Sequence, residues 1–395
     1  MKILLVHNSY RQPGGEDVVF DQERAVLQRF GHNVLTYLRS NNETDSYVGR
    51  ERFRLAVRTI WASDTRDEFA SLLKKEKPDL VHVHNTFLMI SPSIFSACHD
   101  AGVPVVQTLH NYRLYCPAAT FFRDGRPCEE CVSHGLHRAV EHGCYHDSHL
   151  ATVIVALMLT VHRQRHTWTR DIDCYIALTH FARNKFVSAG LPADKVFVKP
   201  NFVYPDPGMR QQGNESYALF VGRLSPAHRI RILLAAWDRL RASRIPLIII
   251  GGGPGLDQLE REASDRCLST VSFLGPLPRD QTLAAMHGAR FLLFPSEWYE
   301  NFPVTIAESF ACGVPVICSR IGAMEEIVED GRTGLHFTPA NPADLAAKVQ
   351  WAWNHQEQMR SIGKEARREY EAKYTADQNY PSLMGIYQRA IENHH

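Results

Sequence analysis

FPSEWYENFPVTIAESFACGVPVICS, residues 294–319, is the stretch that decides the fold. The apolar run FLLF at 291–294 predicts a buried strand, and NFPVTIA after it predicts the opening turns of a helix. Glu300 and Glu308 stand eight residues apart. This step is a little over two helical turns, so we expect both carboxylates on nearly the same helix face. The N–H groups of Phe302, Val304 and Thr305 would point out of the helix start, where the macrodipole favours an anion such as phosphate.

Two glutamates beside a phosphate suggest a ligand that also carries hydroxyl groups, because ionised carboxylates accept hydrogen bonds from hydroxyls. A nucleotide sugar has this chemistry. The alternative is that Glu300 and Glu308 are solvated residues of an ordinary surface helix. The segment closely resembles the Glu-x7-Glu region of the retaining glycosyltransferases of family 4, including the GVPVI strand that follows, and the resemblance covers nearly the whole chain.

Length and composition are those of a soluble globular enzyme. A chain of 395 residues predicts two or three domains, and a net charge of +1 excludes a global field that would attract nucleic acid. The first residues form too short an apolar run for a signal peptide, and the apolar segment 149–168 predicts a packed helix rather than a membrane span. We therefore expect a cytoplasmic protein whose nine cysteines are reduced thiols or metal ligands.

The N-terminal segment predicts the first unit of a doubly wound domain. KILLVH at 2–7 is followed by a glycine-containing loop and an amphipathic stretch, and ligands of such domains bind at the carboxyl ends of the strands. Gly14 and Gly15 lack Cβ atoms and would let the backbone approach a diphosphate. PDLVHVHN and PVVQTLHN predict two further strands that deliver His84 and His110 to the same edge. In the family a GG pair faces the donor, and His110 matches an active-site histidine that contacts the donor sugar, whereas His84 has no comparable match.

Residues 112–147 lack periodicity and are rich in cysteine and histidine. Cys116, Cys128, Cys131 and Cys144 have the spacing C-x11-C-x2-C-x12-C, which suits tetrahedral zinc coordination in a loop that otherwise has little to hold it. Alternatively they are four small buried hydrophobic residues. Other candidate ligands are His134, His137, His142 and His146.

The prolines between 200 and 207 predict a domain linker, and SYALFVGRLSP at 216–226 opens the second domain with a strand that ends at Gly222 and Arg223. In the family an arginine here pairs with the donor diphosphate, and so does a lysine five residues later. This chain has His228 at that position. Either His228 is protonated beside the phosphates, or Arg229 or Arg231 substitutes, or the donor binds more weakly.

The resemblance implies the GT-B architecture, with two doubly wound Rossmann-like domains facing across a cleft and a C-terminal helix that returns to the first domain. We expect an acceptor-side domain at 1–203 with the cysteine-rich insertion at 112–147, a nucleotide-sugar domain at 204–370 and a helical tail at 371–395. The implied catalytic residues are His110 near the reacting sugar, Arg223 on the diphosphate and Glu300 on the sugar hydroxyls. The implied donor-binding residues are Gly14, Gly15, Arg223, His228, Glu300, Asn301, Phe302, Val304, Thr305 and Glu308, of which Glu308 would hold the ribose.

The expected reaction is metal-independent transfer of a sugar, with retention, from a UDP- or GDP-sugar to a hydroxyl of a sugar or lipid-linked sugar, in polysaccharide or glycolipid assembly. No Asp-x-Asp follows a predicted strand to hold a catalytic cation. The alternatives are a nucleotide-sugar epimerase of the same architecture and a non-catalytic nucleotide-sugar-binding protein. An epimerase needs additional acid–base side chains around the sugar, and none can be identified in the sequence.

Residues 46–61 alternate basic and apolar side chains, with Arg50, Arg52, Arg54 and Arg58 among Phe53 and other hydrophobic residues. Such a stretch can lie on an anionic membrane, which suggests peripheral contact with the inner face of the plasma membrane. The alternative is an ordinary helix with its apolar face on the core and its arginines in water.

Overall fold

The structure is a computed structural model that describes residues 1–12, 14–211, 213, 215–224 and 229–394. The chain forms two compact units. Unit 1 contains Met1–Pro200 and Asp377–His395, and unit 2 contains Asn201–Ala376. The sequence predicts a domain boundary at residue 203 and a tail from residue 371, whereas unit 1 ends at Pro200 and resumes at Asp377.

Unit 1 is built on a six-stranded parallel sheet with the order β2-β1-β3-β4-β7-β8. Its strands are β1 (Lys2–Ser9), β2 (Asn33–Ser40), β3 (Leu80–Val83), β4 (Val105–Thr108), β7 (Cys174–Ala177) and β8 (Val196–Val198). Its helices are α1 (Gly15–Arg29), η1 (Asn41–Thr44), α2 (Arg50–Ile60), α3 (Ser63–Glu76), α4 (Ser93–Ala101), α7 (His149–Gln164), α8 (His180–Ser188) and α16 (Ala376–Asn393).

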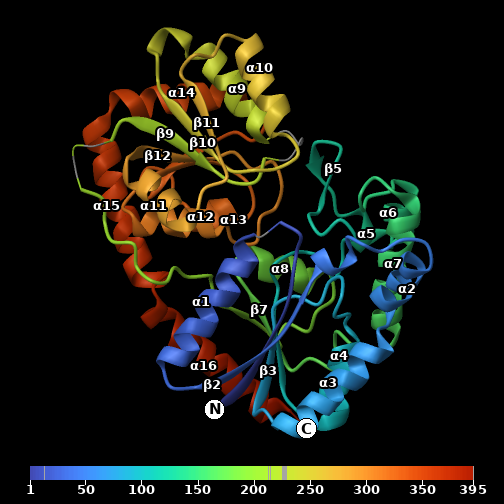
Figure 1. Ribbon diagram of the computed structural model, residues 1–395. Helices are drawn as coiled ribbons and strands as arrows, with labels where there is room; N and C mark the ends of the chain where they lie inside the picture. Colours follow the sequence, from blue (N-terminus) through green and yellow to red (C-terminus); the bar gives the residue numbers. More distant parts are fainter. Residues whose placement is uncertain (13, 212, 214, 225–228, 395) are drawn as a thin grey trace. The chain divides into compact units, whose positions relative to one another are not determined.

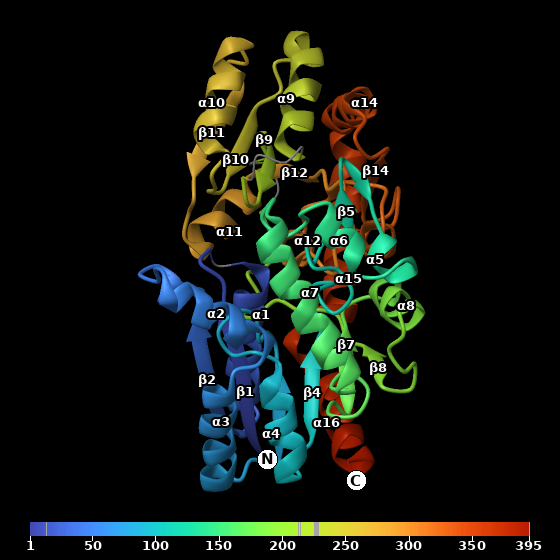
Figure 2. The same ribbon diagram turned by 90° about the vertical axis from the view of Figure 1, so that its right-hand side faces the viewer.

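The C-terminal helix α16 belongs to unit 1, apart from its first residue, although it follows unit 2 in the sequence. It lies against the sheet, as both ribbon views show (Figure 1 and Figure 2), and Tyr387 of α16 contacts His82 of β3. Strands β3, β4 and β7 are buried along their whole length. This burial explains their continuous apolar runs, because helices cover both faces of a parallel sheet.

Unit 2 repeats the same architecture with a six-stranded parallel sheet of order β11-β10-β9-β12-β13-β14. Its strands are β9 (Tyr217–Val221), β10 (Leu247–Ile250), β11 (Val271–Gly275), β12 (Ala289–Phe294), β13 (Val316–Ser319) and β14 (Gly334–Phe337). Its helices are α9 (Arg229–Arg239), η2 (Arg241–Ser243), α10 (Leu256–Asp265), α11 (Arg279–His287), α12 (Val304–Ala311), α13 (Ala323–Ile327), α14 (Pro342–Asn354) and α15 (Gln356–Lys373). The prediction of two doubly wound Rossmann-like folds is confirmed.

The segment 112–147 is more structured than its sequence suggests. It contains the hairpin β5 (Phe122–Arg123) and β6 (Arg126–Pro127) and the short helices α5 (Glu130–Ser133) and α6 (His137–Glu141). Arg123 and Arg138 both pair with Glu130, and the buried ring of Phe121 packs on Tyr112 at 4.7 Å. The expectation that little besides a metal holds this loop is therefore wrong.

Among the described residues, no helix has the length and apolar character needed to cross a membrane. The apolar segment beginning at His149 forms α7, which ends at Gln164. One face of α7 is buried, including Val155, Met158 and Leu159. This segment is therefore a packed helix, as predicted.

Candidate functional site

The order of the strands in unit 2 reverses between β9 and β12, and we therefore take this point of the sheet as the candidate ligand site. Successive strands β9, β10 and β11 extend to one side, whereas β12, β13 and β14 extend to the other. The loops after β9 and β12 therefore diverge at the carboxyl edge of the sheet, which is where ligands of such folds bind. Arg223 follows β9 and Glu300 follows β12, so both belong to loops at this edge.

Glu300 does not lie on the helix with Glu308, which corrects the sequence prediction. Helix α12 begins at Val304, and Glu300 lies in the loop that joins it to β12. The reason is Pro303, because a proline disfavours helical backbone at the preceding residue and has no N–H to donate. Pro303 caps the helix with extended backbone, at φ −70° and ψ 110°. The carboxylate of Glu300 accepts a hydrogen bond from Ser296 Oγ at 3.1 Å.

Glu308 lies within α12 and is buried, with 9% of its surface exposed. Its Oε1 accepts a hydrogen bond from Nε of Arg279, the first residue of α11, at 3.0 Å. Burial raises the pKa of Glu308, while the nearby Arg279 charge and hydrogen bond lower it. The first turn of α12 contains Val304 and Thr305 and carries no acidic side chain, so its backbone N–H groups keep their attraction for an anion.

The loop that carries Arg223 is held against the loop after β10. Leu224 N donates to Gly252 O at 2.9 Å, and Gly255 N donates to Leu224 O at 3.0 Å. A Cβ added at Gly253 would lie 2.2 Å from Leu224 O, and this glycine has a φ of +151°. Only glycine therefore permits this close approach. Arg223 itself is exposed at the end of β9.

His228, proposed to replace the family's lysine, lies outside the described residues. Of the two suggested substitutes, Arg231 pairs through Nε with Glu262 at 3.3 Å. The side chain of Arg229 likewise lies outside what the structure describes.

In unit 1, Gly14 caps α1 and Gly15 begins it. The N–H of Gly14 donates to Asp17 Oδ2 at 2.7 Å, and Asp17 Oδ1 contacts His7 Nε2 at 2.9 Å. The Gly14 N–H is thus engaged by the protein itself. Glu16 and Asp17 place two carboxylates in the first turn, which weakens the attraction of this helix start for a diphosphate.

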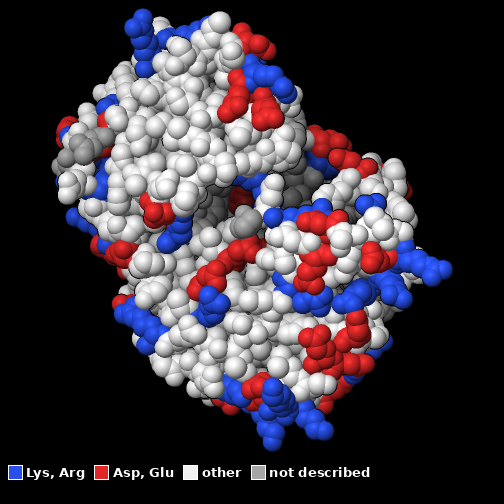
Figure 3. Space-filling model, viewed as in Figure 1, with Lys and Arg blue, Asp and Glu red and all other residues white. Residues whose placement is uncertain are grey.

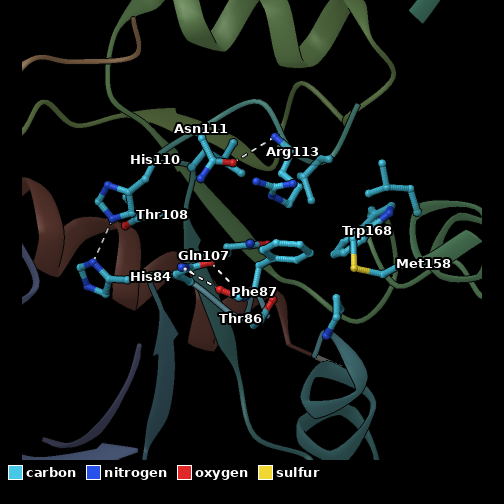
Figure 4. A pocket seen from close by; sticks show the side chains of 15 residues that line it. His84, Thr86, Phe87, Gln107, Thr108, His110, Asn111, Arg113, Met158 and Trp168 are labelled. Carbon is cyan, nitrogen blue, oxygen red and sulfur yellow. Dashed lines mark hydrogen bonds between the residues drawn. The ribbon is translucent and has the colours of Figure 1, made fainter. Parts of the chain in front are cut away.

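His84 and His110 do come together, as the adjacent strands predict. His84 Nδ1 and His110 Nε2 are 3.0 Å apart, and the rings stack with centroids 5.2 Å apart. Figure 4 shows the pair at one side of a small cavity of about 40 Å³, which is also lined by Phe87, Arg113 and Trp168. The Arg113 guanidinium lies 4.0 Å from the centroid of the Phe87 ring.

A buried polar network beneath His84 was not predicted from the sequence. Glu23 of α1 lies with Oε2 3.2 Å from Lys199 Nζ and Oε1 2.9 Å from His82 Nδ1. Nζ of Lys199 also donates to Asn379 Oδ1 of α16 at 3.0 Å. Glu23, His82 and His84 each have an atom that could bind a metal ion, and these three atoms lie within 4.8 Å of one another. The ammonium of Lys199 already supplies the positive charge that balances Glu23.

The four cysteines of the insertion are free thiols. Cys116 and Cys131 are buried, and Cys128 and Cys144 are partly exposed. Burial, followed by the charges of the other three thiols, raises the pKa of Cys131 to about 12. No three of these sulfur atoms lie within 4.8 Å of one another in the structure as described. Zinc coordination would therefore require the side chains to draw together.

The chain matches two family models of glycosyltransferases, one for each unit. The family described as Glycosyltransferase Family 4 matches residues 13–207, and the family described as Glycosyl transferases group 1 matches residues 208–369. The O-antigen chain mannosyltransferase C of Escherichia coli is 30% identical over 186 residues, which are 47% of this chain and 49% of that protein. The chain thus spans about half the length of this relative.

One curated relative is similar in sequence along both units. Glycogen synthase of Mycobacterium tuberculosis is 27% identical over 388 residues, covering 89% of this chain and 85% of that protein. HepE of Anabaena, solved in complex with UDP and glucose, has the same fold, with a TM-score of 0.70, 17% identity and coverage of 98% of this chain and 99% of that one. The two family matches adjoin and together span residues 13–369. The chain therefore belongs to the family 4, group 1 glycosyltransferases and has the GT-B fold.

Proposed function

We propose that this protein transfers a sugar, with retention of anomeric configuration, from a nucleoside-diphosphate sugar to a hydroxyl acceptor. The observation that carries the proposal is the strand order of unit 2, which places Arg223, Glu300 and the start of α12 after two neighbouring strands from which the sheet extends in opposite directions. This combination offers a cation and backbone N–H groups to a diphosphate, and carboxylates to sugar hydroxyls. The family to which the chain belongs supports the same reaction.

The proposed donor places its diphosphate at Arg223 and at the N–H groups of Phe302, Val304 and Thr305. Cleavage of the anomeric C–O bond leaves negative charge on the diphosphate, and fixed donors aimed at that charge lower the barrier without a metal ion. The acceptor hydroxyl forms the new C–O bond on the same face, and its proton passes to the departing phosphate oxygen. His228 would add a further positive charge if it is protonated there.

Glu308 is assigned to the ribose and Glu300, with Asn301, to the hydroxyls of the donor sugar. Ser296 supports the orientation of Glu300, and Arg279 supports that of Glu308. We assign His110 of unit 1 to the reacting sugar, and Gly14 and Gly15 to the donor side of that unit. The occupied N–H of Gly14 leaves Gly15 as the stronger of these two candidates.

The base of the donor is proposed to be uracil or guanine. The bound UDP of the structurally similar HepE supports the first, and the name of the mannosyltransferase relative is compatible with either. The acceptor is proposed to be a growing glycan, free or linked to lipid. The names of the O-antigen and glycogen relatives support this class.

A lipid-linked acceptor would be reached from the inner face of the cytoplasmic membrane. Helix α2 exposes Phe53 at 71% and Val57 at 51%, and it packs on α7, which exposes Leu150 at 74%. Figure 3 shows basic side chains gathered over the position of α2, where Arg50, Arg52 and Arg54 are exposed. Apolar side chains among arginines suit an anionic lipid surface. Arg58 is excluded from this surface because it pairs with Asp64 of α3.

A structural zinc ion is proposed for Cys116, Cys128, Cys131 and Cys144. The support is that four free thiols with zinc-ligand spacing share one insertion. Zinc would stabilise all four as thiolates and draw their sulfur atoms together.

The function is tested with UDP-, GDP- and ADP-sugars, first by thermal shift and then by release of nucleoside diphosphate in the presence of glycan acceptors. We expect one class of donor to stabilise the protein and to be cleaved only with an acceptor. Binding without release would instead indicate a sensor. Conversion of the sugar without transfer would indicate an epimerase.

A further inference from the structure

Three side chains from three different elements of unit 1 form a continuous line to the cavity in Figure 4. Glu23 comes from α1, His84 follows β3 and His110 follows β4. Glu23 Oε1 is 3.4 Å from His84 Nε2, a charge contact in which neither atom makes a hydrogen bond. His84 Nδ1 and His110 Nε2 are hydrogen-bonded at 3.0 Å, as Figure 4 shows. Glu23 and His84 are buried, and His110 is partly exposed at the cavity.

Glu23 is a carboxylate in this environment, because three positive or proton-bearing groups surround it. Lys199 lies on Oε2, and His82 and His84 lie on Oε1. These partners hold the pKa of Glu23 well below its usual value, against the opposing effect of burial. A carboxylate can only accept hydrogen bonds. Oε1 makes no hydrogen bond, but its negative charge attracts an N–H and repels a lone pair, so we infer that the histidine nitrogens nearest to it, Nδ1 of His82 and Nε2 of His84, carry protons.

The same reasoning fixes the next two protons. Burial depresses the pKa of His84 to about 4 and that of His110 well below its usual value, so both rings are neutral at pH 7. A neutral imidazole has one N–H. If His84 carries its proton on Nε2, its Nδ1 can only accept, and His110 must donate from Nε2. His110 then has an unprotonated Nδ1.

We propose that Glu23, acting through His84, fixes the tautomer of His110 so that Nδ1 is a hydrogen-bond acceptor for a hydroxyl of the substrate. Glu23 and His84 are thus positioning residues and do not touch the substrate. The identity of the hydroxyl as a sugar hydroxyl rests on the proposed function. The reversed arrangement, with a proton on His110 Nδ1, would present a donor and would select a different group.

His82 supplies a control for this proposal. It lies beside the same Glu23 oxygen as His84, but its other partners are Tyr387 and Thr108 and not His110. Its Nδ1 lies 2.7 Å from the hydroxyl of Tyr387, and its Nε2 lies 2.8 Å from Thr108 Oγ1. Removing the Tyr387 hydroxyl disturbs this branch of the network and leaves the line from Glu23 to His110 intact. Tyr387→Phe is therefore the matched control.

The test is ¹⁵N NMR of the unliganded, full-length protein labelled at histidine, with His110 assigned from the signals that disappear in His110→Gln. The expected spectrum shows a protonated Nε2 and an unprotonated Nδ1 for His110. Glu23→Gln can turn its amide N–H₂ toward His84, so the proton of His110 should move wholly or partly to Nδ1. Tyr387→Phe should leave the His110 pattern unchanged. A protonated Nδ1 in the wild type, or an unchanged pattern in Glu23→Gln, overturns the proposal.

Glu23→Gln leaves the ammonium of Lys199 buried without its carboxylate and can fail to fold for that reason. The double variant Glu23→Gln, Lys199→Met removes this charge and carries the same tautomer test. Once a donor that supports transfer is known, the double variant should transfer sugar about tenfold more slowly than the wild type, which is the equivalent of one hydrogen bond. Its affinity for the bare nucleoside diphosphate should stay within about twofold of the wild-type value. Absence of transfer by the wild type would contradict the proposed function alone, because the NMR result needs no substrate.

Discussion

Arg279 donates a hydrogen bond from Nε to Oε1 of Glu308 at 3.0 Å, which links the first residue of α11 to a buried carboxylate of α12. The two residues are 29 positions apart in the sequence. The pair matters for binding because Glu308 accepts hydrogen bonds from ribose more strongly when it is ionised. Burial works against ionisation, and Arg279 works for it.

The first prediction follows from this competition. Loss of the Arg279 charge should raise the pKa of Glu308 further, since burial would then act unopposed. Affinity for nucleoside diphosphate should fall as the pH is lowered through that pKa, and Arg279→Gln should shift this fall to higher pH. Calorimetric titrations over a pH series measure it, with Arg320→Gln, which removes an exposed arginine paired with Glu325, as control. Identical pH profiles for wild type and Arg279→Gln would contradict this account.

The second prediction concerns acid stability. The pKa values of His84 and His162 are depressed from 6.5 to about 4, because burial disfavours their charged forms. Between these values the unfolded chain binds protons that the folded chain does not, so stability should rise with pH from about 4 to 6.5 and level off above. His162→Gln should reduce the slope by up to about 1.4 kcal/mol per pH unit.

Urea-unfolding curves at several pH values measure this slope. His99→Gln, at the exposed end of α4, is the control and should leave it unchanged. A slope that is the same in wild type and His162→Gln would show that His162 takes up no proton on unfolding.

The third prediction concerns the cysteine cluster. Protein purified without chelator should contain about one zinc per chain, and Cys128→Ser or Cys131→Ser should lower both the metal content and the thermal stability. Cys267→Ser changes an exposed cysteine outside the insertion and should alter neither. If the protein is fully stable without metal, the zinc proposal is wrong and the four cysteines act only as small buried side chains.

The fourth prediction concerns the membrane. The wild type should bind anionic liposomes at low salt and release them as salt rises, since each arginine near such a surface contributes about 1 kcal/mol. The triple variant Arg50, Arg52, Arg54 to Glu should lose this binding while remaining folded. The same charge change at the exposed residues Arg239, Arg241 and Arg244 should have less effect. If wild type fails to bind at low salt, a soluble acceptor becomes the better proposal.

Much of the fold could be predicted because its signals are local. The apolar runs that begin at Lys2, Leu80 and Val105 became β1, β3 and β4, and parallel pairing brought His84 and His110 together at one edge. In unit 2 the predicted strands before Arg223 and Glu300 became β9 and β12, and the structure adds that the two strands are neighbours. Strand patterns and short loops determine which ends meet.

The rest depended on interactions that the sequence pattern does not reveal. Glu23 and Lys199 are 176 residues apart, and neither belongs to a motif. An amphipathic helix pattern gives no sign that a glutamate on the buried face will be ionised. The position of Glu300 could have been predicted, because Pro303 excludes a helix start before it.

Calorimetric binding of the bare nucleoside diphosphate and of the intact donor to Glu308→Gln and Glu300→Gln tests the central claim most directly. If Glu308 holds the ribose, Glu308→Gln should weaken both ligands by about 1–3 kcal/mol, the strength of a charged hydrogen bond. Glu300→Gln should weaken the donor and leave the bare nucleotide unchanged, because Glu300 is assigned to the sugar. Equal losses of bare-nucleotide affinity in the two variants would contradict the assignment of Glu308 to the ribose and Glu300 to the sugar, and no loss in either variant would contradict the placement of the donor in unit 2.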